Sequence, residues 1–251
     1  MTALLSIEGV TRRFGGLTAI DDVTASLRHH ELVGLIGPNG AGKTTLFNLI
    51  SGFTPLSAGA IYFKGRRIDR LKPFDIAHLG VGRTFQNLRI FPNMSVFDNV
   101  SVGAIGAQGV GVVSTLLRRR GPAEAISEQT WAALRAVGLE AQATELAANL
   151  SYGRRKYLEI ARALALDPEL LILDEPAAGL NDTETQGLAD FIRRLHKGGL
   201  SILLVEHDMK LVMSICQRVV VLASGRKIAD APPAVVKADP AVLEAYLGVE
   251  T

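Results

Sequence analysis

Residues 37–45 read GPNGAGKTT and follow the apolar run LVGLI. They fill every fixed position of the pattern G-x-x-x-x-G-K-[ST], which turns from a strand into a helix around bound phosphate. Glycines let successive backbone N–H groups point at phosphate oxygens, and the dipole of the following helix adds positive potential. A glycine-rich turn without a ligand is the less favoured alternative, because the flanking elements are also correct. The residues expected at the nucleotide are Gly37, Pro38, Asn39, Gly40, Ala41, Gly42, Lys43, Thr44 and Thr45. Lys43 would reach the terminal phosphates, and the Thr44 hydroxyl would ligate Mg²⁺.

Two carboxylates follow a second apolar run in the stretch LLILDEP. Asp174 and Glu175 therefore lie at the carboxyl end of a buried strand, where an open α/β sheet binds its ligands. Phosphoryl transfer needs charge compensation and an aligned nucleophile. We expect Asp174 to hold Mg²⁺ directly or through water, and Glu175 to polarise the attacking water as a base. Adjacent carboxylates after a strand are often only the start of a solvated loop, but the phosphate loop makes catalysis the favoured interpretation.

A third run, SILLV, is followed by Glu206, His207 and Asp208. A single histidine at a strand end is more often a surface or core residue than a catalytic one. Beside two other polar strand ends, however, a contact between His207 and the γ-phosphate is the favoured role.

The stretch NLSYGRRKYL, residues 149–158, places three consecutive basic residues at the start of a predicted helix. It could be a basic patch for nucleic acid, or a helix start whose free N–H groups face an anion. Further along this helix, Arg155, Glu159 and Arg162 are spaced to form ion pairs on one face. The basic run therefore does not by itself require nucleic acid.

Apolar, β-branched runs bounded by turn or polar residues predict the strands that must position these groups. The predicted strands are Leu4 to Ile7, Leu32 to Ile36, Ile61 to Phe63, Leu170 to Leu173, Ser201 to Val205 and Val219 to Ala223. The predicted helices are Lys43 to Gly52, Trp131 to Val137, Arg154 to Leu166, Glu184 to His196 and Met209 to Arg218. Strands that alternate with helices predict an α/β fold, with a parallel sheet covered on both faces. Residues 88–165 lack convincing strands and are expected to form a helical insertion.

The composition fits one compact domain or two small lobes. The chain has 251 residues, 48% of them apolar, and a formal charge of +2, which gives no chain-wide electrostatic footprint for nucleic acid. The single Cys216 excludes an internal disulfide and a cysteine-based zinc site. The first residues lack a signal-peptide pattern, so we expect a cytoplasmic protein. The uncharged segment 99–117 is too rich in glycine and polar residues for a membrane span, and we expect a helix and then a loop that ends at Gly121 and Pro122.

These motifs, in this order, resemble the nucleotide-binding subunit of ABC transporters over essentially the whole chain. The resemblance implies one ABC ATPase domain, 1–251, with a P-loop NTPase core. Residues 1–87 and 166–251 would form the nucleotide-binding core, with a mainly parallel sheet and a small antiparallel β subdomain. Residues 88–165 would form the helical subdomain.

Leu150 to Arg154, LSYGR, resemble the signature motif of that family, which closes over the γ-phosphate held by the phosphate loop of a partner subunit. Ser151 can donate its hydroxyl, and Gly153 permits close approach of the backbone. The resemblance therefore implies that both act on the partner's ATP. Tyr152 replaces the first of two glycines, and Arg154 stands where glutamine is usual. A nucleic-acid patch becomes the less favoured interpretation, because it would call for more basic residues on adjacent elements.

Three further positions resemble functional residues of the family. Phe14 matches the aromatic residue that stacks on adenine, although a buried apolar anchor is nearly as plausible from sequence. Gln86 matches the glutamine that senses Mg²⁺ and the attacking water, on a loop that faces the membrane partner. Residues 179–182 resemble the loop that crosses the subunit interface; alternatively, Asn181 and its neighbours cap the next helix.

Several separated stretches resemble the ATPases of branched-chain amino acid importers, notably RTFQNLRIFPNMSVFDNV, EHDMKLVM and DPAVLEAYLG. The implied cofactors are ATP and Mg²⁺. The implied partners are a second ATPase subunit, identical or homologous, two multi-span permeases contacted near Leu88, Arg89 and Phe91, and indirectly an external binding protein. No nucleic acid partner is expected, and the chain would be peripheral on the inner face of the membrane. The alternatives left open are an importer of urea or amides, a lipopolysaccharide exporter, an ABC ATPase acting on ribosomes or DNA, and a small-molecule kinase.

Overall fold

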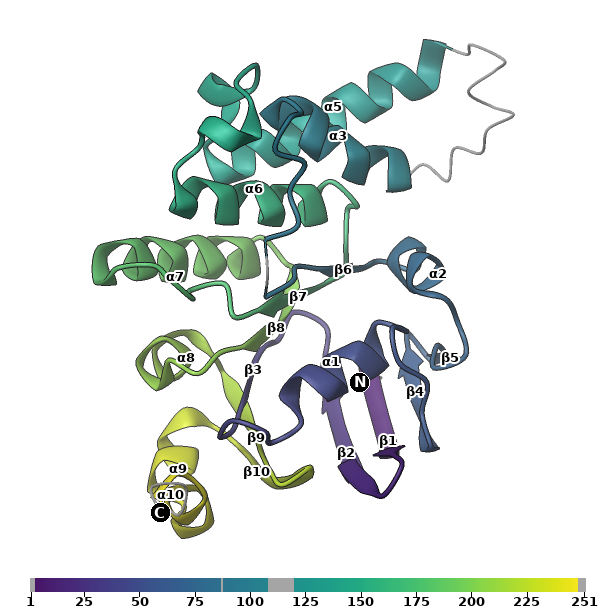
Figure 1. The fold of residues 1–251 in the computed structure, drawn as a ribbon, viewed down its shortest axis with the longest axis vertical. Coiled ribbons are helices and arrows are strands. Elements are labelled where there is room, and N and C mark those ends of the chain that lie inside the picture. The colour runs from purple at the N-terminus through teal and green to yellow at the C-terminus, as the bar shows by residue number, and fades with distance from the viewer. Residues whose placement is uncertain (1–2, 87, 108–119, 248–251) are drawn as a thin grey trace.

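The computed structural model describes residues 3–86, 88–107 and 120–247. These residues form two sheets and several layers of helices (Figure 1). The first sheet has the order β2-β1-β4-β5 and the second β10-β9-β3-β8-β7-β6. Their strands are β1 (Leu5–Phe14), β2 (Leu17–Leu27), β3 (Leu32–Ile36), β4 (Ala58–Phe63), β5 (Arg66–Arg67), β6 (Val81–Arg83), β7 (Leu170–Asp174), β8 (Ser201–Val205), β9 (Arg218–Ala223) and β10 (Arg226–Ala231).

The four-stranded sheet is antiparallel, whereas the central strands of the six-stranded sheet are parallel. Two-residue turns join β1 to β2 and β9 to β10. Gly15 and Gly16 join β1 to β2, with Phe14 opposite Leu17. Between β9 and β10, Ser224 and Gly225 both have positive φ, which is the backbone that two-residue hairpins require.

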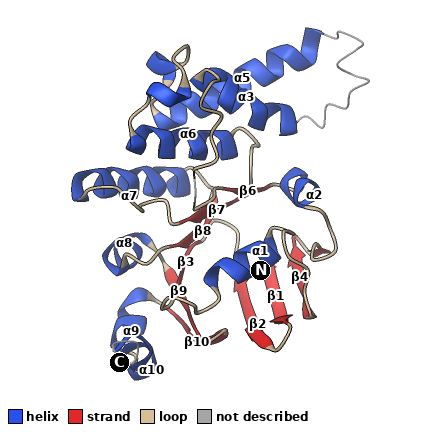
Figure 2. Ribbon diagram, viewed as in Figure 1, coloured by secondary structure: helices blue, strands red, loops and turns tan. Residues whose placement is uncertain are grey.

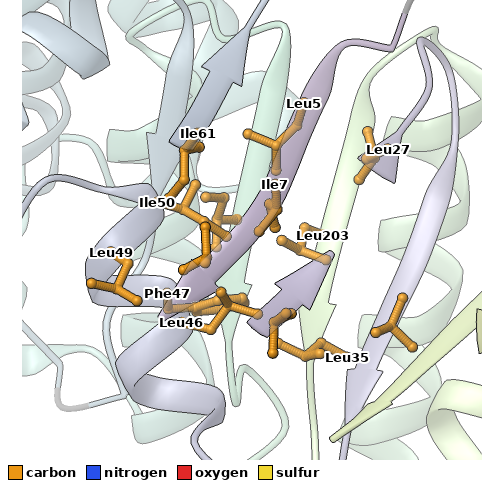
Figure 3. Close-up of a cluster of buried hydrophobic side chains, with 14 of the residues drawn as sticks. Leu5, Ile7, Leu27, Leu35, Leu46, Phe47, Leu49, Ile50, Ile61 and Leu203 are labelled. Atoms are coloured by element: carbon orange, nitrogen blue, oxygen red, sulfur yellow. The ribbon is translucent and has the colours of Figure 1, made fainter. Parts of the chain in front are cut away.

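The six-stranded sheet buries both faces, because alternate residues of each strand point to opposite sides. On β7, Leu170 and Ile172 belong to one buried cluster, while Leu171 and Leu173 belong to another. The first cluster lies between this sheet, the four-stranded sheet and α1 (Lys43–Ile50), whose Leu46, Phe47, Leu49 and Ile50 fill it (Figure 3). The phosphate loop is therefore fixed at both ends by a packed strand and a packed helix.

Helices α7 (Asp182–Lys197) and α8 (Met209–Ile215) cover the other face of the six-stranded sheet (Figure 2). The short helices α9 (Pro233–Ala238) and α10 (Pro240–Leu247) contribute Val236 and Val242 to the same cluster. Cys216 is buried in this cluster, and burial raises its pKa. Helix α2 (Pro73–His78) packs near β6.

A separate helical part consists of α3 (Val96–Ala107), α5 (Arg120–Val137) and α6 (Tyr152–Leu164), with the short 3₁₀ helices Glu140–Gln142 and Ala147–Asn149. Its own cluster includes Val96, Val100, Leu134 and Leu158. In Figure 1 these helices stack above α7, on the far side from α9 and α10. Helix α6 faces both ways, since Ile160 and Ala163 belong to the cluster under α7 and α8.

The predicted α/β fold, with a mainly parallel sheet, a small antiparallel sheet and helices, is confirmed. Strands β2, β5, β6 and β10 were not predicted. Strands β1 and β4 are longer than predicted. Apart from the start of α5, the ends of the predicted helices differ from those observed by at most three residues. Helix α5 begins at Arg120 rather than Trp131, so Gly121 and Pro122 lie in its first turn, where proline is tolerated. In the uncharged segment, α3 extends to Ala107, and the predicted loop beyond it lies outside the described residues. Among the helices that the structure describes, none combines the length and apolarity needed to cross a bilayer.

Candidate nucleotide-binding site

The phosphate loop runs from the end of β3 into α1, as its sequence predicts. Lys43 is almost fully buried, and its Nζ donates to the carbonyl oxygens of Gly37 at 2.7 Å and Pro38 at 3.0 Å. Burial lowers the pKa of Lys43, and the nearby Glu175 and Asp174 carboxylates oppose that shift. Gly42 precedes α1 in a left-handed conformation, and no side chain caps the helix. The N–H groups of the first helical turn therefore remain available for an anion.

A cavity of about 580 Å³ opens beside this loop. Its lining includes ten of the predicted site residues: Phe14, Asn39, Gly40, Ala41, Gly42, Lys43, Thr44, Thr45, Gln86 and Glu175. Gly40 has a positive φ, and a Cβ built there meets nothing within 4 Å, so the loop leaves room for a ligand against its backbone. The Phe14 ring is 45% exposed, with the Arg12 guanidinium 4.3 Å from its centroid. The ring is thus available at the cavity rather than being a buried anchor.

Glu175 and Gln86 line one side of the cavity, and His207 lies next to Glu175 without being part of the lining. Glu175 lies just after β7 with a φ of 48°, a backbone conformation that non-glycine residues rarely adopt and that is often found at functional sites. Its Oε2 accepts a hydrogen bond from Nε2 of Gln86 at 2.9 Å, and Nδ1 of His207 lies 3.8 Å from the same oxygen. The Glu175 carboxylate can therefore face a group bound in the cavity, and the exposed His207 ring lies within reach of that carboxylate.

Asp174 is buried directly behind this cluster. Its Oδ2 accepts from the Arg83 guanidinium at 3.2 Å, and both side chains are less than 10% exposed. Burial raises the pKa of Asp174, and the charge and hydrogen bond of Arg83 oppose that shift. Thr44 and Gln86 line the cavity, and Asp174 lies behind Glu175, so the three side chains offer the oxygen ligands that Mg²⁺ prefers. These residues fit the predicted ion.

Two residues that contact this cluster were missed in the sequence. Arg83 ends β6, 91 residues before its partner Asp174, and its spacing gave no signal of that contact. Glu206 was noticed only as a strand end, but it is fully buried and its Oε1 accepts from the backbone N–H of Ala177 at 2.7 Å. Its Oε2 has no hydrogen-bond partner among the described atoms and lies 3.9 Å from Nδ1 of His207. A carboxylate directly after an apolar strand and beside a histidine was the available signal.

The signature residues Ser151 and Gly153 do not line this cavity. Ser151 is the N-cap of α6, and its Oγ accepts from the backbone N–H of Arg154 at 3.4 Å. Gly153 is buried, and a Cβ there would lie 3.0 Å from Oε1 of Glu184. The structure thus places the signature residues and the phosphate loop of one chain in different locations.

The expected ion pairs along α6 were wrong. Instead of pairing with Glu159, the Arg155 side chain donates to the backbone carbonyls of Leu150 and Ala148. Lys156 is only 3% exposed, and its Nζ donates to the carbonyl of Glu175 at 3.3 Å. Two of the three basic residues that could have formed a nucleic-acid patch are therefore engaged within the chain.

Glu159 and Arg162 of α6 instead support the segment that carries Gln86. Oε1 of Glu159 accepts from the backbone N–H of Phe85 at 3.1 Å, and Arg162 donates to the carbonyl of Arg89. Burial raises the pKa of Glu159. The two polar side chains thus bind the chain on both sides of Gln86. Hydrogen bonding to this loop, rather than pairing along the helix, explains their positions.

Asn181 caps α7, which was one of the two roles predicted for it. Its side chain accepts from the backbone N–H of Glu184 at 2.9 Å, and Oε2 of Glu184 accepts from the backbone N–H of Asn181 at 3.0 Å. This reciprocal arrangement is a capping box, which satisfies two of the free N–H groups at the start of α7. The loop from Pro176 to Leu180 is therefore fixed at its far end by α7.

Comparisons with known proteins agree with this geometry. A family model described as ABC transporter matches residues 20–178, and one described as branched-chain amino acid ATP-binding cassette transporter matches residues 226–251. The high-affinity branched-chain amino acid transport ATP-binding protein LivG of Escherichia coli (strain K12) is 44% identical, and the match covers 98% of both chains. The protein of the same description named BraF, from Pseudomonas aeruginosa, is 41% identical, also with 98% of both chains covered.

Solved structures show the same fold. The ATP-binding cassette MJ1267 of an ABC transporter has a TM-score of 0.86 and 30% identity, over 98% of this chain and 99% of that one. Its ADP conformation has a TM-score of 0.85, with 29% identity over 99% and 100% of the two chains. The ABC transporter model matches more than half of the chain, and the relatives are similar along its whole length. This protein therefore belongs to the ATP-binding proteins of ABC transporters, in the branched-chain amino acid group.

Proposed function

We propose that this chain hydrolyses ATP to ADP and phosphate and thereby powers the import of branched-chain amino acids. The observation that carries the reaction is the convergence of Glu175 and Gln86 on the cavity beside the phosphate loop. The names of LivG and BraF, which are similar along the full chain, support the substrate class. This choice is favoured over urea or amide import, lipopolysaccharide export, work on ribosomes or DNA, and small-molecule phosphorylation.

In the proposed reaction, the loop N–H groups and Lys43 hold the β- and γ-phosphates, and Phe14 stacks on the base. Glu175 orients and polarises a water, takes its proton as the water oxygen bonds to the γ-phosphorus, and ADP leaves as the bond to the bridging oxygen breaks. His207 contacts the γ-phosphate. Thr44, Gln86 and Asp174 would hold Mg²⁺, which when bound neutralises charge on the phosphates.

A complete site is proposed to need two chains. Because Ser151 is exposed and lies outside the cavity of its own chain, we propose that it contacts a nucleotide held by a second ATPase subunit, identical or homologous, and that Gly153 beside it lets the backbone approach that nucleotide. ATP shared between two chains would favour the closed pair, and hydrolysis would remove that preference.

Permease docking is proposed at a cleft of about 250 Å³ between the core and the helical part. Phe53, Phe91 and Val102 line it and expose 50%, 44% and 39% of their surface. The cleft also includes Phe85, next to Gln86, so a permease segment seated there would contact the loop that senses the nucleotide. Two permeases would hold the ATPases at the inner face of the membrane, and an external binding protein would deliver the amino acid.

The reaction is tested with Glu175→Gln, which keeps the side-chain shape and the Gln86 contact but removes the base. We expect ATP hydrolysis to fall about 100- to 10,000-fold, because general-base catalysis contributes about that much, while nucleotide binding persists. The matched control is Glu140→Gln, an exposed glutamate on the helical part. Wild-type turnover by the Glu175 variant would overturn the role assigned to this carboxylate.

The substrate and the partners are tested on the complex extracted from membranes in mild detergent. Two multi-span permeases should co-purify, and the reconstituted complex should take up labelled leucine in an ATP-dependent way. Uptake of urea instead would contradict the proposed substrate. Recovery with ribosomes or nucleic acid in place of permeases would contradict transport altogether.

A further inference from the structure

Tyr152 occupies the first helical position of α6, between the signature residues Ser151 and Gly153. Its hydroxyl donates to the backbone carbonyl of Ala178 at 3.3 Å, so it reaches the loop that follows Glu175. Its ring lies so close to Gly179 that a Cβ there would be 2.9 Å from Cε1 of the tyrosine. Gly179 also has a φ of 79°, which a side chain rarely tolerates. The ring and the glycine therefore fit only as a pair.

Two more contacts join the same two segments. The buried Gly153 lies against Oε1 of Glu184, which belongs to the cap at the end of the loop. Lys156, one turn further along α6, donates from Nζ to the carbonyl of Glu175 at 3.3 Å and lies 5.6 Å from the centroid of the Tyr152 ring. The start of α6 thus touches the beginning, the middle and the end of residues 175–184.

We propose that Tyr152 is a positioning residue that holds residues 176–181 against the first turn of α6. This inference rests on the proposed function, in which Glu175 serves the chain's own nucleotide and Ser151 serves that of the partner. Tyr152 contacts the middle of this loop, where no other side chain of the first turn of α6 is placed by the contacts above. If the partner's nucleotide moves the start of α6, Tyr152 therefore displaces the loop that follows Glu175, the base at the chain's own nucleotide. The tyrosine links the two sites through one chain.

The contact can be measured without nucleotide or partner, by hydrogen exchange in the full-length, nucleotide-free chain. Loss of the hydroxyl bond in Tyr152→Phe should speed amide exchange in residues 176–181 roughly threefold, and loss of the ring in Tyr152→Gly roughly tenfold or more. The control is Tyr62→Phe, which removes a tyrosine hydroxyl from β4 in the other sheet. Unchanged exchange of the loop in both Tyr152 variants would overturn the proposal, whatever their ATPase activity.

A double-mutant cycle tests whether the ring and the loop are coupled in the reaction. Gly179→Ala carries the same backbone strain in either background, but the steric clash exists only when Tyr152 is present. We expect it to lower kcat about fivefold more in the wild-type background than in the Tyr152→Gly background, with the KM for ATP within about twofold throughout, because the phosphate loop is untouched. Additive effects on kcat would contradict the link. Lack of ATPase activity in the wild-type complex would instead contradict the proposed function, and the exchange experiment would still stand.

Discussion

The clusters on the two faces of the six-stranded sheet consist mainly of leucine, isoleucine, valine and phenylalanine, whereas six of the twelve buried residues in the helical cluster are alanines. A buried alanine removes much less apolar area from water than a leucine does, so each contact in the helical part contributes less to stability. The helices are therefore expected to open or shift more easily than the sheet. This division suits a motor in which a fixed core holds the nucleotide and a second part moves.

The two regions also differ in what their buried polar groups do. In the core, Asp174 ends β7 and pairs with Arg83, and Glu206 follows β8 and accepts from the backbone N–H of Ala177. In the helical part, Glu159 and Arg162 bind backbone groups of the loop that leads from the core. The core polar groups thus lie beside Glu175 in the chain or in space, whereas those of the helical part hold the connection between the two regions.

The largest effects on stability are expected from truncating a fully buried leucine in each region, Leu171 of β7 in the core and Leu134 of α5 in the helical part. Leu171→Ala should lower the free energy of unfolding of the whole protein by about 2–5 kcal/mol, since it leaves a cavity in the core. Leu134→Ala should instead speed amide exchange mainly in α3, α5 and α6, because those helices open locally. Denaturant unfolding and hydrogen exchange check both changes.

The control for this pair is Leu243→Ala, since that leucine of α10 is 48% exposed. It should change neither the unfolding free energy nor the exchange pattern by much. If Leu134→Ala accelerated exchange equally in β7 and β8, the two regions would unfold as one unit, and the comparison would fail.

Two carboxylates with opposite pKa shifts sharpen the comparison. Burial alone would raise the pKa of Glu31, but bonds from the Arg218 side chain, at 2.8 and 3.0 Å, and from the Arg28 backbone hold it below the ordinary 4.5. The stability that Glu31 contributes is present above its unfolded pKa and is lost as the pH falls through its folded pKa, below about 4.5. Glu31→Gln should therefore destabilise the protein at pH 7 by about 1–2 kcal/mol and flatten its acid dependence.

For Glu159 in the helical part the pKa shift, and with it the pH dependence of stability, has the opposite sign. Because burial raises its folded pKa, the folded protein binds more protons than the unfolded chain between the two pKa values, and stability falls as the pH rises through that window. Glu159→Gln should leave stability at pH 7 unchanged or raise it by up to about 1 kcal/mol, since the amide oxygen can still accept from Phe85. Urea unfolding from pH 3 to 8 measures both variants, and destabilisation of equal size at pH 7 would contradict the contrast.

The smallest expected effects on stability come from removing the N-cap side chains of α7 in the core and of α6 in the helical part. Asn181→Ala removes a capping box on α7 and should cost about 1 kcal/mol, or about 2–4 °C in Tm. Ser151→Ala removes a single bond of 3.4 Å on α6 and should cost only a few tenths of a kcal/mol. Under the proposed function, the serine variant should lose ATPase activity well beyond its loss of stability. A larger Tm change for Ser151→Ala than for Asn181→Ala would make the serine chiefly structural.

Prediction succeeded where the signal was local. The phosphate loop, the carboxylates after LLIL and the cap at Asn181 depend on residues a few positions apart. Strand β2 was missed because its Asp21 and Asp22 interrupt the apolar alternation, although Gly15 and Gly16 between two runs indicated a hairpin. Strand β6 was missed because it has only three residues, and its extended conformation depends on pairing with β7, which lies far along the chain. Glu159 was assigned to an ion-pairing face because the loop that buries it comes from about 70 residues earlier in the chain.

By itself, the sequence determined the nucleotide chemistry, the alternation of strands and helices, and the family, because glycine placement, apolar periodicity and charged strand ends are properties of short segments. Only the tertiary structure decided which segments meet: Arg83 with Asp174, Glu206 with Ala177, and Tyr152 with Gly179. Each of these contacts joins residues 26 or more positions apart. Their meeting depends on strand order and on the packing of α6 against the loop before α7, which the spacing of residues along the chain does not encode.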